Sequence, residues 1–125
     1  MLINPSPLVE KVIGCAIEVH RTLGPGLLES AYDFCLTHEW QLSGINFRRQ
    51  VEVPVIYRGT RLNCGYRVDF IVEDTLLVEI KSIERLLSIH QAQVLTYMRL
   101  RDLHQGLLMN FNTNRLVDGL RSLLR

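Results

Sequence analysis

The sequence predicts an α/β fold in which a mixed β-sheet is flanked by helices. Three features predict it: two stretches with helical periodicity open the chain, alternating apolar segments follow from residue 47, and a helical stretch then separates two apolar strands. A strand, a helix and another strand in succession favour parallel pairing, so the sheet should be mixed. The expected element order is α-α-β-β-β-α-β, within a single domain over residues 1–125.

Composition is that of an ordinary globular protein. The 125 residues are 47% hydrophobic and 22% charged, with a formal net charge of +1. Because this net charge is small, the protein as a whole is not attracted to nucleic acid, and any surface that binds it must be a local patch of positive charge.

The sequence also predicts a cytoplasmic protein with no membrane attachment. No apolar run approaches the roughly 20 residues that cross a bilayer, and the N-terminal residues do not form a signal peptide. Cys15, Cys35 and Cys64 are odd in number and form no C-x-x-C pair, which favours reduced cysteines over disulfides or a zinc site.

Two helices should open the chain. Ser6 and Pro7 form a good N-terminus, and Gly24-Pro25-Gly26 ends the first helix. Its apolar stripe comprises Val9, Ile13, Ala16, His20 and Leu23. The second helix should run from about 27 to 42. On its surface Glu29, Tyr32 and Leu36 share one face, which places a carboxylate in the first turn of a face that otherwise points inward.

The segment from Tyr66 to Lys81, YRVDFIVEDTLLVEIK, should be a β-hairpin with a loop at 73–75. That loop pairs Val72 with Leu76, and therefore Asp69 with Glu79 and Arg67 with Lys81. One face then carries Arg67, Asp69, Ile71, Leu77, Glu79 and Lys81. The other carries Tyr66, Val68, Phe70, Val72, Leu76, Val78, Ile80 and Ser82, and its apolar character favours this register.

The remaining segments complete the sheet. An alternating segment comprises Val51, Val53 and Val55, separated by Glu52 and Pro54, and Pro54 indicates an edge strand or a bulge. A turn at Arg58-Gly59 then leads into a strand from Leu62 to Val72, which passes through Gly65. A helix from about 88 to 101 has His90, Gln93 and Tyr97 on one face. A buried strand follows at 106–111, and the tail at 116–125 is ambiguous between helix and strand.

From the residues alone, Asp69, Glu79 and Lys81 form either a metal site with a catalytic lysine or a cross-strand ion pair on a solvated face. Carboxylate oxygens suit hard ions such as Mg²⁺ or Mn²⁺, which polarise a phosphate and lower the pKa of an attacking water. Lysine could orient or deprotonate that water and offset transition-state charge.

Several motifs of the sequence resemble those of a known protein family. Gly26, Glu29 and Tyr32 form a G-x-x-E-x-x-Y pattern, which resembles the family of that name in the PD-(D/E)xK nuclease superfamily. Further similar segments are EVHRTLGPGLLESAY, VPVIYRG, RVDFIVEDTLLVEIKSI, HQAQVLTYMRL and GLLMNFN, so the resemblance covers nearly the whole chain. Val68 stands where the superfamily pattern has proline.

The resemblance implies a restriction-endonuclease-like core and a set of functional residues. Asp69, Glu79, Lys81 and Glu29 would be catalytic, and Asp69, Glu79, Glu29 and the Ile80 carbonyl would bind Mg²⁺ or Mn²⁺. Gln93 and Tyr97 match the Q-x-x-x-Y element of RecB-like nucleases and would support the site. His20 is the third supporting candidate, beside Glu29.

Each assignment has a structural alternative. Glu29 could only complement the helix dipole, Gln93 and Tyr97 could be an ordinary half-buried face, and His20, on an apolar stripe, suits a satisfied core histidine. A scattered set of arginines could contact phosphate or simply lie at the surface: Arg48, Arg49, Arg58, Arg61, Arg67 and Arg85.

Two functions follow. The first is a metal-dependent nuclease, with DNA favoured over RNA. The second is a catalytically silent module that associates with nucleic acid or protein, including as a homodimer.

Overall fold

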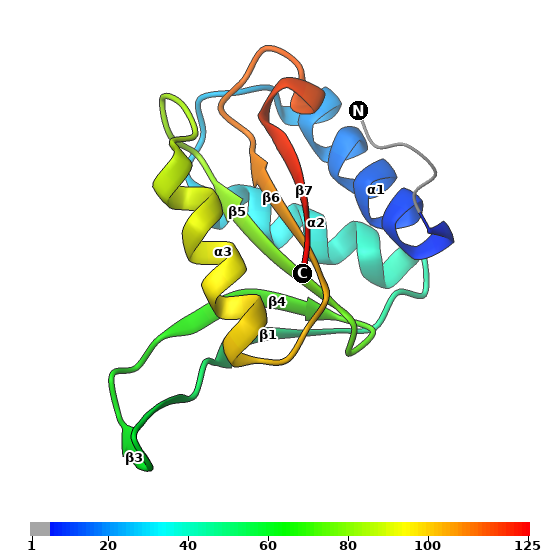
Figure 1. Ribbon diagram of the computed structural model, residues 1–125. Helices are drawn as coiled ribbons and strands as arrows, with labels where there is room; N and C mark the ends of the chain where they lie inside the picture. The colour runs from blue at the N-terminus through cyan, green and yellow to red at the C-terminus, as the bar shows by residue number, and fades with distance from the viewer. Residues whose placement is uncertain (1–5) are drawn as a thin grey trace.

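The computed structural model describes residues 6–125 as a five-stranded mixed sheet with helices on both faces (Figure 1). The elements are α1 Pro7–Leu23, α2 Glu29–Leu42, β1 Phe47–Glu52, β2 Val55–Tyr57, β3 Thr60–Leu62, β4 Arg67–Val72, β5 Leu76–Lys81, α3 Ser88–Leu100, β6 Gln105–Asn110, the short 3₁₀ helix η1 Leu116–Gly119 and β7 Leu120–Leu124. The main sheet has the order β1-β4-β5-β6-β7, in which only the β5–β6 pair is parallel. The predicted α/β fold with a mixed sheet is confirmed.

The two predicted N-terminal helices form because their ends carry strong signals. The Ser6 side chain accepts a hydrogen bond from the Val9 amide, which satisfies one of the free N–H groups of the first turn of α1. Gly24 ends α1 with φ of 73°, a left-handed value that glycine adopts without strain.

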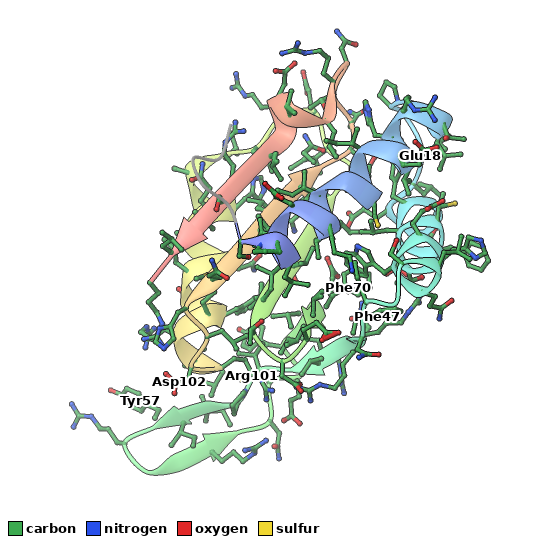
Figure 2. All side chains as sticks on the ribbon, turned by 90° about the vertical axis from the view of Figure 1, so that its right-hand side faces the viewer. Glu18, Phe47, Tyr57, Phe70, Arg101 and Asp102 are labelled. Carbon is green, nitrogen blue, oxygen red and sulfur yellow. The ribbon has the colours of Figure 1, made fainter. Side chains whose placement is uncertain are left out.

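Two apolar clusters fix the layers. α1 and α2 cover one face of the sheet, where Trp40 packs edge-on against Phe70 at 4.9 Å between ring centroids and Phe47 lies beside them (Figure 2). α3 covers the other face, where Val94 and Met98 pack against the sheet. Because both faces are covered, the central strands β4 and β5 are buried on both sides.

The predicted register of the β4–β5 hairpin is confirmed at Phe70↔Val78, Ile71↔Leu77 and Val72↔Leu76. The α1–α2 cluster contains Phe70, Val72, Leu76, Val78 and Ile80, which agrees with the predicted faces. Val68 and Asp69 are the exceptions, because Val68 packs in the α3 cluster with Ile71 and Leu77, whereas Asp69 lies with Ile80 beside residues of α2. The predicted pairs Asp69↔Glu79 and Arg67↔Lys81 do not form. Strict alternation therefore fails at Asp69, where the two strands lose their backbone pairing.

The prediction of a continuous strand from Leu62 to Val72 is wrong. Residues 63–66 are irregular, with Gly65 at φ of 74°, and the alternating segment before them breaks at Val53-Pro54. The chain between the two breaks forms a separate two-stranded ribbon, β2–β3. Proline removes a donor from the strand and glycine allows the sharp change of direction, so the ribbon leaves the main sheet.

The C-terminal tail combines both predicted alternatives, since η1 is followed by β7, which pairs antiparallel with β6.

Helix α3 and strand β6 confirm the predicted crossover between parallel strands. Within residues 6–125, no helix combines the length and apolar character needed to cross a bilayer.

The close packing of α3 on β6 generates a stability prediction. A Cβ on Gly106 would lie 2.6 Å from Met98 Sδ and 3.2 Å from Val94 Cγ1, so Gly106→Val should lower the free energy of unfolding by about 1–3 kcal/mol. Gly14→Ala, in α1 with no atom within 4 Å of the added Cβ, should instead raise it by about 1 kcal/mol through helix propensity. Urea denaturation of both variants checks this, and equal destabilisation by the two would contradict the packing explanation.

Candidate active site

The carboxylates of Asp69 and Glu79 lie where β4 and β5 separate. The backbone pairing ends at Phe70↔Val78. Beyond it, the Asp69 amide donates to Glu79 Oε1 at 2.7 Å, and the Ile80 amide donates to Asp69 Oδ2 at 2.9 Å. Each carboxylate thus takes the place of a backbone carbonyl and satisfies an otherwise unpaired amide of the opposite strand.

Gln50 of β1 completes this opening on the other side of Asp69. Its backbone has φ of 49°, and the β1–β4 register passes from Arg49↔Phe70 to Val51↔Val68 without a backbone pair between Gln50 and Asp69. The Gln50 side-chain amide donates to Asp69 Oδ1 at 3.5 Å. Gln50 carries no signal in the sequence, because nothing in its position predicts a left-handed residue inside a strand.

A pocket of about 460 Å³ opens between α2 and the separated strands. It is lined by Glu29, Ser30, Asp33, Phe34, Arg49, Gln50, Asp69 and Ile80. Glu79 does not line this pocket; its side chain is only 6% exposed. The structure therefore brings Glu29, Asp69 and Ile80 together around one space, with Glu79 buried behind them.

Glu29 reaches this pocket because the loop before α2 is held in place. The Tyr32 hydroxyl donates to the Gly24 carbonyl at 2.6 Å and accepts from the Leu27 amide at 3.2 Å, while the Tyr32 ring stacks on Phe111 at 4.6 Å between centroids. Glu29 is the first residue of α2 and is exposed at the pocket rim. The face shared by Glu29 and Tyr32 thus joins a buried anchor to an accessible carboxylate.

Arg49 also belongs to the pocket wall. Its Nη1 atom lies 2.9 Å from Asp33 Oδ1 and its Nη2 donates to Thr37 Oγ1 at 2.6 Å, yet the side chain is still 47% exposed. The sequence showed Arg49 only as one of several arginines. Its orientation depends on α2 packing over β1, which sequence spacing does not reveal.

The three carboxylates have raised pKa values. Burial raises the pKa of Glu79 to about 8, and the neighbouring charge of Asp69 adds to this. Burial likewise raises the pKa of Asp69, opposed by the Ile80 amide and by Lys81, and burial raises the pKa of Glu29, opposed by Lys81. At neutral pH the site therefore carries acid groups whose ionised forms lack full compensation.

Lys81 is half-buried at the end of β5, two residues after Glu79 on the same strand. Its charge lowers the pKa of all three carboxyl groups, although it forms none of the side-chain ion pairs found within residues 6–125. The amine thus acts on the cluster from a distance and is not locked to one carboxylate.

The supporting candidates lie in different places. Tyr97 is buried on α3, and burial together with the charge of Glu79 raises its pKa. Gln93, one turn earlier on α3, is exposed. His20 is buried, and its Nε2 donates to the Thr113 carbonyl at 2.7 Å. His20 is therefore a buried core histidine whose hydrogen-bonding group has a partner, and the contact joins α1 to the segment after β6.

The donor set fits a hard divalent ion, although the cluster is small. Among the described residues, no group of three or more His, Cys, Asp or Glu side chains lies close enough to hold a metal. Asp69 and Glu79 are a pair of carboxylates with raised pKa values, and Glu79 Oε2 accepts no hydrogen bond within residues 6–125. Carboxylate oxygens are the donors that Mg²⁺ or Mn²⁺ prefers, and a bound cation would favour the ionised form of both groups. Coordination by Glu29 and by the Ile80 carbonyl stays a prediction.

Comparison with known proteins gives one family. The family model described as the PD-(D/E)XK nuclease superfamily matches residues 6–123, nearly the whole chain. No curated protein and no solved structure matches. The narrower G-x-x-E-x-x-Y resemblance stays a prediction.

The raised pKa of Glu79 predicts how stability varies with pH. Because the folded protein holds a proton on Glu79 up to about pH 8, wild-type stability should fall as pH rises from the unfolded value of about 4.5 through about 8. Glu79→Gln keeps the acceptor for the Asp69 amide and removes the ionisation. It should therefore stabilise the protein by roughly 2 kcal/mol at about pH 9 and by much less at about pH 5.

Urea denaturation in a chelating buffer at both pH values measures this difference. The control is Glu84→Gln at an exposed position, which should leave the pH dependence of wild type unchanged. A gain from Glu79→Gln that is equal at the two pH values would contradict the assignment of the shift to this carboxyl.

Proposed function

We propose, from the premise that this chain belongs to the PD-(D/E)XK nuclease superfamily, that it is a metal-dependent nuclease that hydrolyses phosphodiester bonds in DNA. The observation that carries the proposal is the reciprocal pairing of Asp69 and Glu79 with the amides of the opposite strands, with Lys81 beside them. Asp69 lines an open pocket, Glu79 is buried behind it, and Lys81 is half-buried two residues further along β5, whereas a surface ion pair would be fully solvated.

The proposed ligands are Asp69, Glu79 and the carbonyl of Ile80, with Mg²⁺ or Mn²⁺ as the ion. When bound, such an ion supplies a Lewis acid that polarises the phosphate and makes a nearby water more acidic. The carboxylates would hold the ion, and its positive charge would offset the buried negative charge that raises the pKa values of Asp69 and Glu79.

Lys81 has the role of orienting the attacking water and stabilising the negative charge that develops on the phosphate. An amine suits this role because it donates several hydrogen bonds and carries a compact charge. Its lack of a close carboxylate partner within residues 6–125 supports this, because an amine locked in an ion pair would have to break it first.

Other pocket residues have supporting roles. Glu29, on the rim, holds a water or a second ion, and the exposed guanidinium of Arg49 contacts a phosphate flanking the scissile bond. Tyr97 lies near enough to Glu79 for that charge to raise the Tyr97 pKa and supports the site from α3, and Gln93 faces substrate from the preceding turn of α3. Cys15, Cys35 and Cys64 are free, which supports a reducing, cytoplasmic setting.

Removal of the amine should abolish cleavage without unfolding the protein. Lys81→Ala should lower the cleavage rate at least 100-fold, as expected for loss of a group acting in the transition state. The sequence has one other lysine, Lys11, exposed on α1, so Lys11→Ala is a matched control that should keep wild-type activity.

Cleavage is measured on linear, circular, nicked and single-stranded DNA and on RNA, with Mg²⁺ or Mn²⁺, and folding by circular dichroism. A wild-type protein inert on all of these substrates with both ions would refute the nuclease proposal and favour the silent module.

Ion binding should stabilise the folded protein. At a Mn²⁺ concentration about 100 times its dissociation constant, the free energy of unfolding should rise by about 2.7 kcal/mol. Asp69→Asn should abolish this increment. The control Asp74→Asn changes an exposed carboxylate at the turn of the same hairpin and should preserve it. Thermal unfolding titrated with Mn²⁺ gives the result, and an equal increment in all three proteins would place the ion elsewhere.

A further inference from the structure

The segment from Val53 to Tyr66, called the arm here, extends away from the body of the protein (Figure 1). Its base is fixed, because the Val53 amide donates to the Tyr66 carbonyl at 2.9 Å and Val53 is buried in the α3 cluster. Beyond the base, β2 and β3 pair only with each other. Ile56 is 61% exposed and Tyr57 63% exposed, and Tyr57 stands on the arm clear of the sheet and helices (Figure 2).

An isolated two-stranded ribbon is marginally stable by itself. Large apolar side chains displayed on both of its faces contribute nothing to the core, and such surfaces mark interaction sites. We therefore expect the arm to bind another molecule, and the charge of the arm indicates which kind.

Positive charge is concentrated in and around the arm. Residues 47–67 hold five arginines and one glutamate, a net charge of +4, whereas the whole chain has +1 and so the remaining residues carry −3. Arg61 pairs with that glutamate, Glu52, at 2.8 Å. Arg58 at the turn lies over the Tyr57 ring at 5.5 Å and forms no ion pair within the described residues.

The base of the arm adjoins the candidate active site. β1 leads into the arm and β4 leads out of it, and Val51 pairs with Val68, the neighbour of Asp69. Arg67 at the end of the arm donates to the Gln50 carbonyl at 3.1 Å, and Arg49 on β1 lines the pocket. With about 3.3 Å per extended residue, the turn at Arg58 lies on the order of 15 Å from this base. Arginines thus lie at the pocket (Arg49), at the base of the arm (Arg67) and at its turn (Arg58).

We propose that the arm binds the duplex of a DNA substrate beside the bond held in the pocket, an inference that rests on the proposed nuclease function. A two-stranded ribbon has the width that the major groove admits. Arginines at its base and tip are placed to contact successive phosphates, and Tyr57 supplies an amphipathic contact. A second copy of the chain fits less well, because two arms brought together would oppose like charges.

The test compares two variants with the same change in net charge. Arg58→Gln/Arg61→Gln removes two charges from the arm. Arg21→Gln/Arg115→Gln removes two from α1 and the segment preceding η1, where each arginine is in an exposed ion pair, as Arg61 is on the arm. Binding to a fluorescein-labelled DNA duplex of mixed sequence is followed by anisotropy in a chelating buffer over a range of salt, with folding checked by circular dichroism. Duplex cleavage with Mg²⁺ is measured in parallel.

The arm variant should bind the duplex at least 10-fold more weakly at low salt. The slope of log affinity against log salt should decrease by about 1–2, as for loss of one or two phosphate contacts, while the control variant keeps wild-type affinity and slope. In cleavage, the arm variant should show a raised KM with kcat little changed.

Equal losses in both variants, or wild-type binding by the arm variant, would overturn the proposal. So would an arm-dependent preference for single strands, or a dimer that the arm variant dissociates without loss of DNA affinity. Duplex binding that depends on the arm, without cleavage, would support the proposed role of the arm and refute the nuclease proposal. Cleavage with the same KM in wild type and the arm variant would support the nuclease proposal and refute the role of the arm.

Discussion

Two hydrogen bonds between carboxylates and strand amides hold β4 and β5 together after their backbone pairing has ended. A sheet that simply came apart would leave the amides of Asp69 and Ile80 unpaired and partly buried, which costs free energy for each group. The carboxylates remove that cost and at the same time create the space between the strands. The separation is therefore stable only with acceptor side chains at these two positions, and the site and the local fold depend on the same atoms.

The same arrangement carries an electrostatic cost. Glu79 is buried close to Asp69, whose amide donates to its Oε1, and burial raises the pKa values of both carboxyl groups. Lys81 offsets part of this charge from a distance. A set of groups that is not at its stability optimum is typical of functional sites, where binding of substrate or ion supplies the missing compensation.

The irregularities of the sheet occur around Asp69 on β4. Gln50 has a left-handed backbone opposite Asp69, Val68 departs from strict alternation, and the arm leaves the sheet at Val53-Pro54 and returns before Arg67. At Asp69 itself β4 has no backbone pair with Gln50 of β1 or with Glu79 of β5, so the strand is open on both edges at this residue. In this way the chain combines a rigid hydrophobic core with a locally open sheet.

The sequence by itself determined the three helices and the register of the central hairpin between Phe70 and Val78. Periodicity, the Ser6 cap and the breaks at Gly24 and Gly44 mark the helices, and the apolar face from Phe70 to Ile80 permits only one pairing of β4 with β5, because a shift by one residue would bury charge. Tertiary structure decided what local patterns do not encode. Contacts between segments distant in the chain produce the burial of Glu79, the orientation of Arg49 by α2, the hydrogen bond of His20 to Thr113 and the departure of the arm. Local propensity fixes dihedral preferences over a few residues, whereas burial and charge compensation depend on which surfaces meet when the whole chain folds.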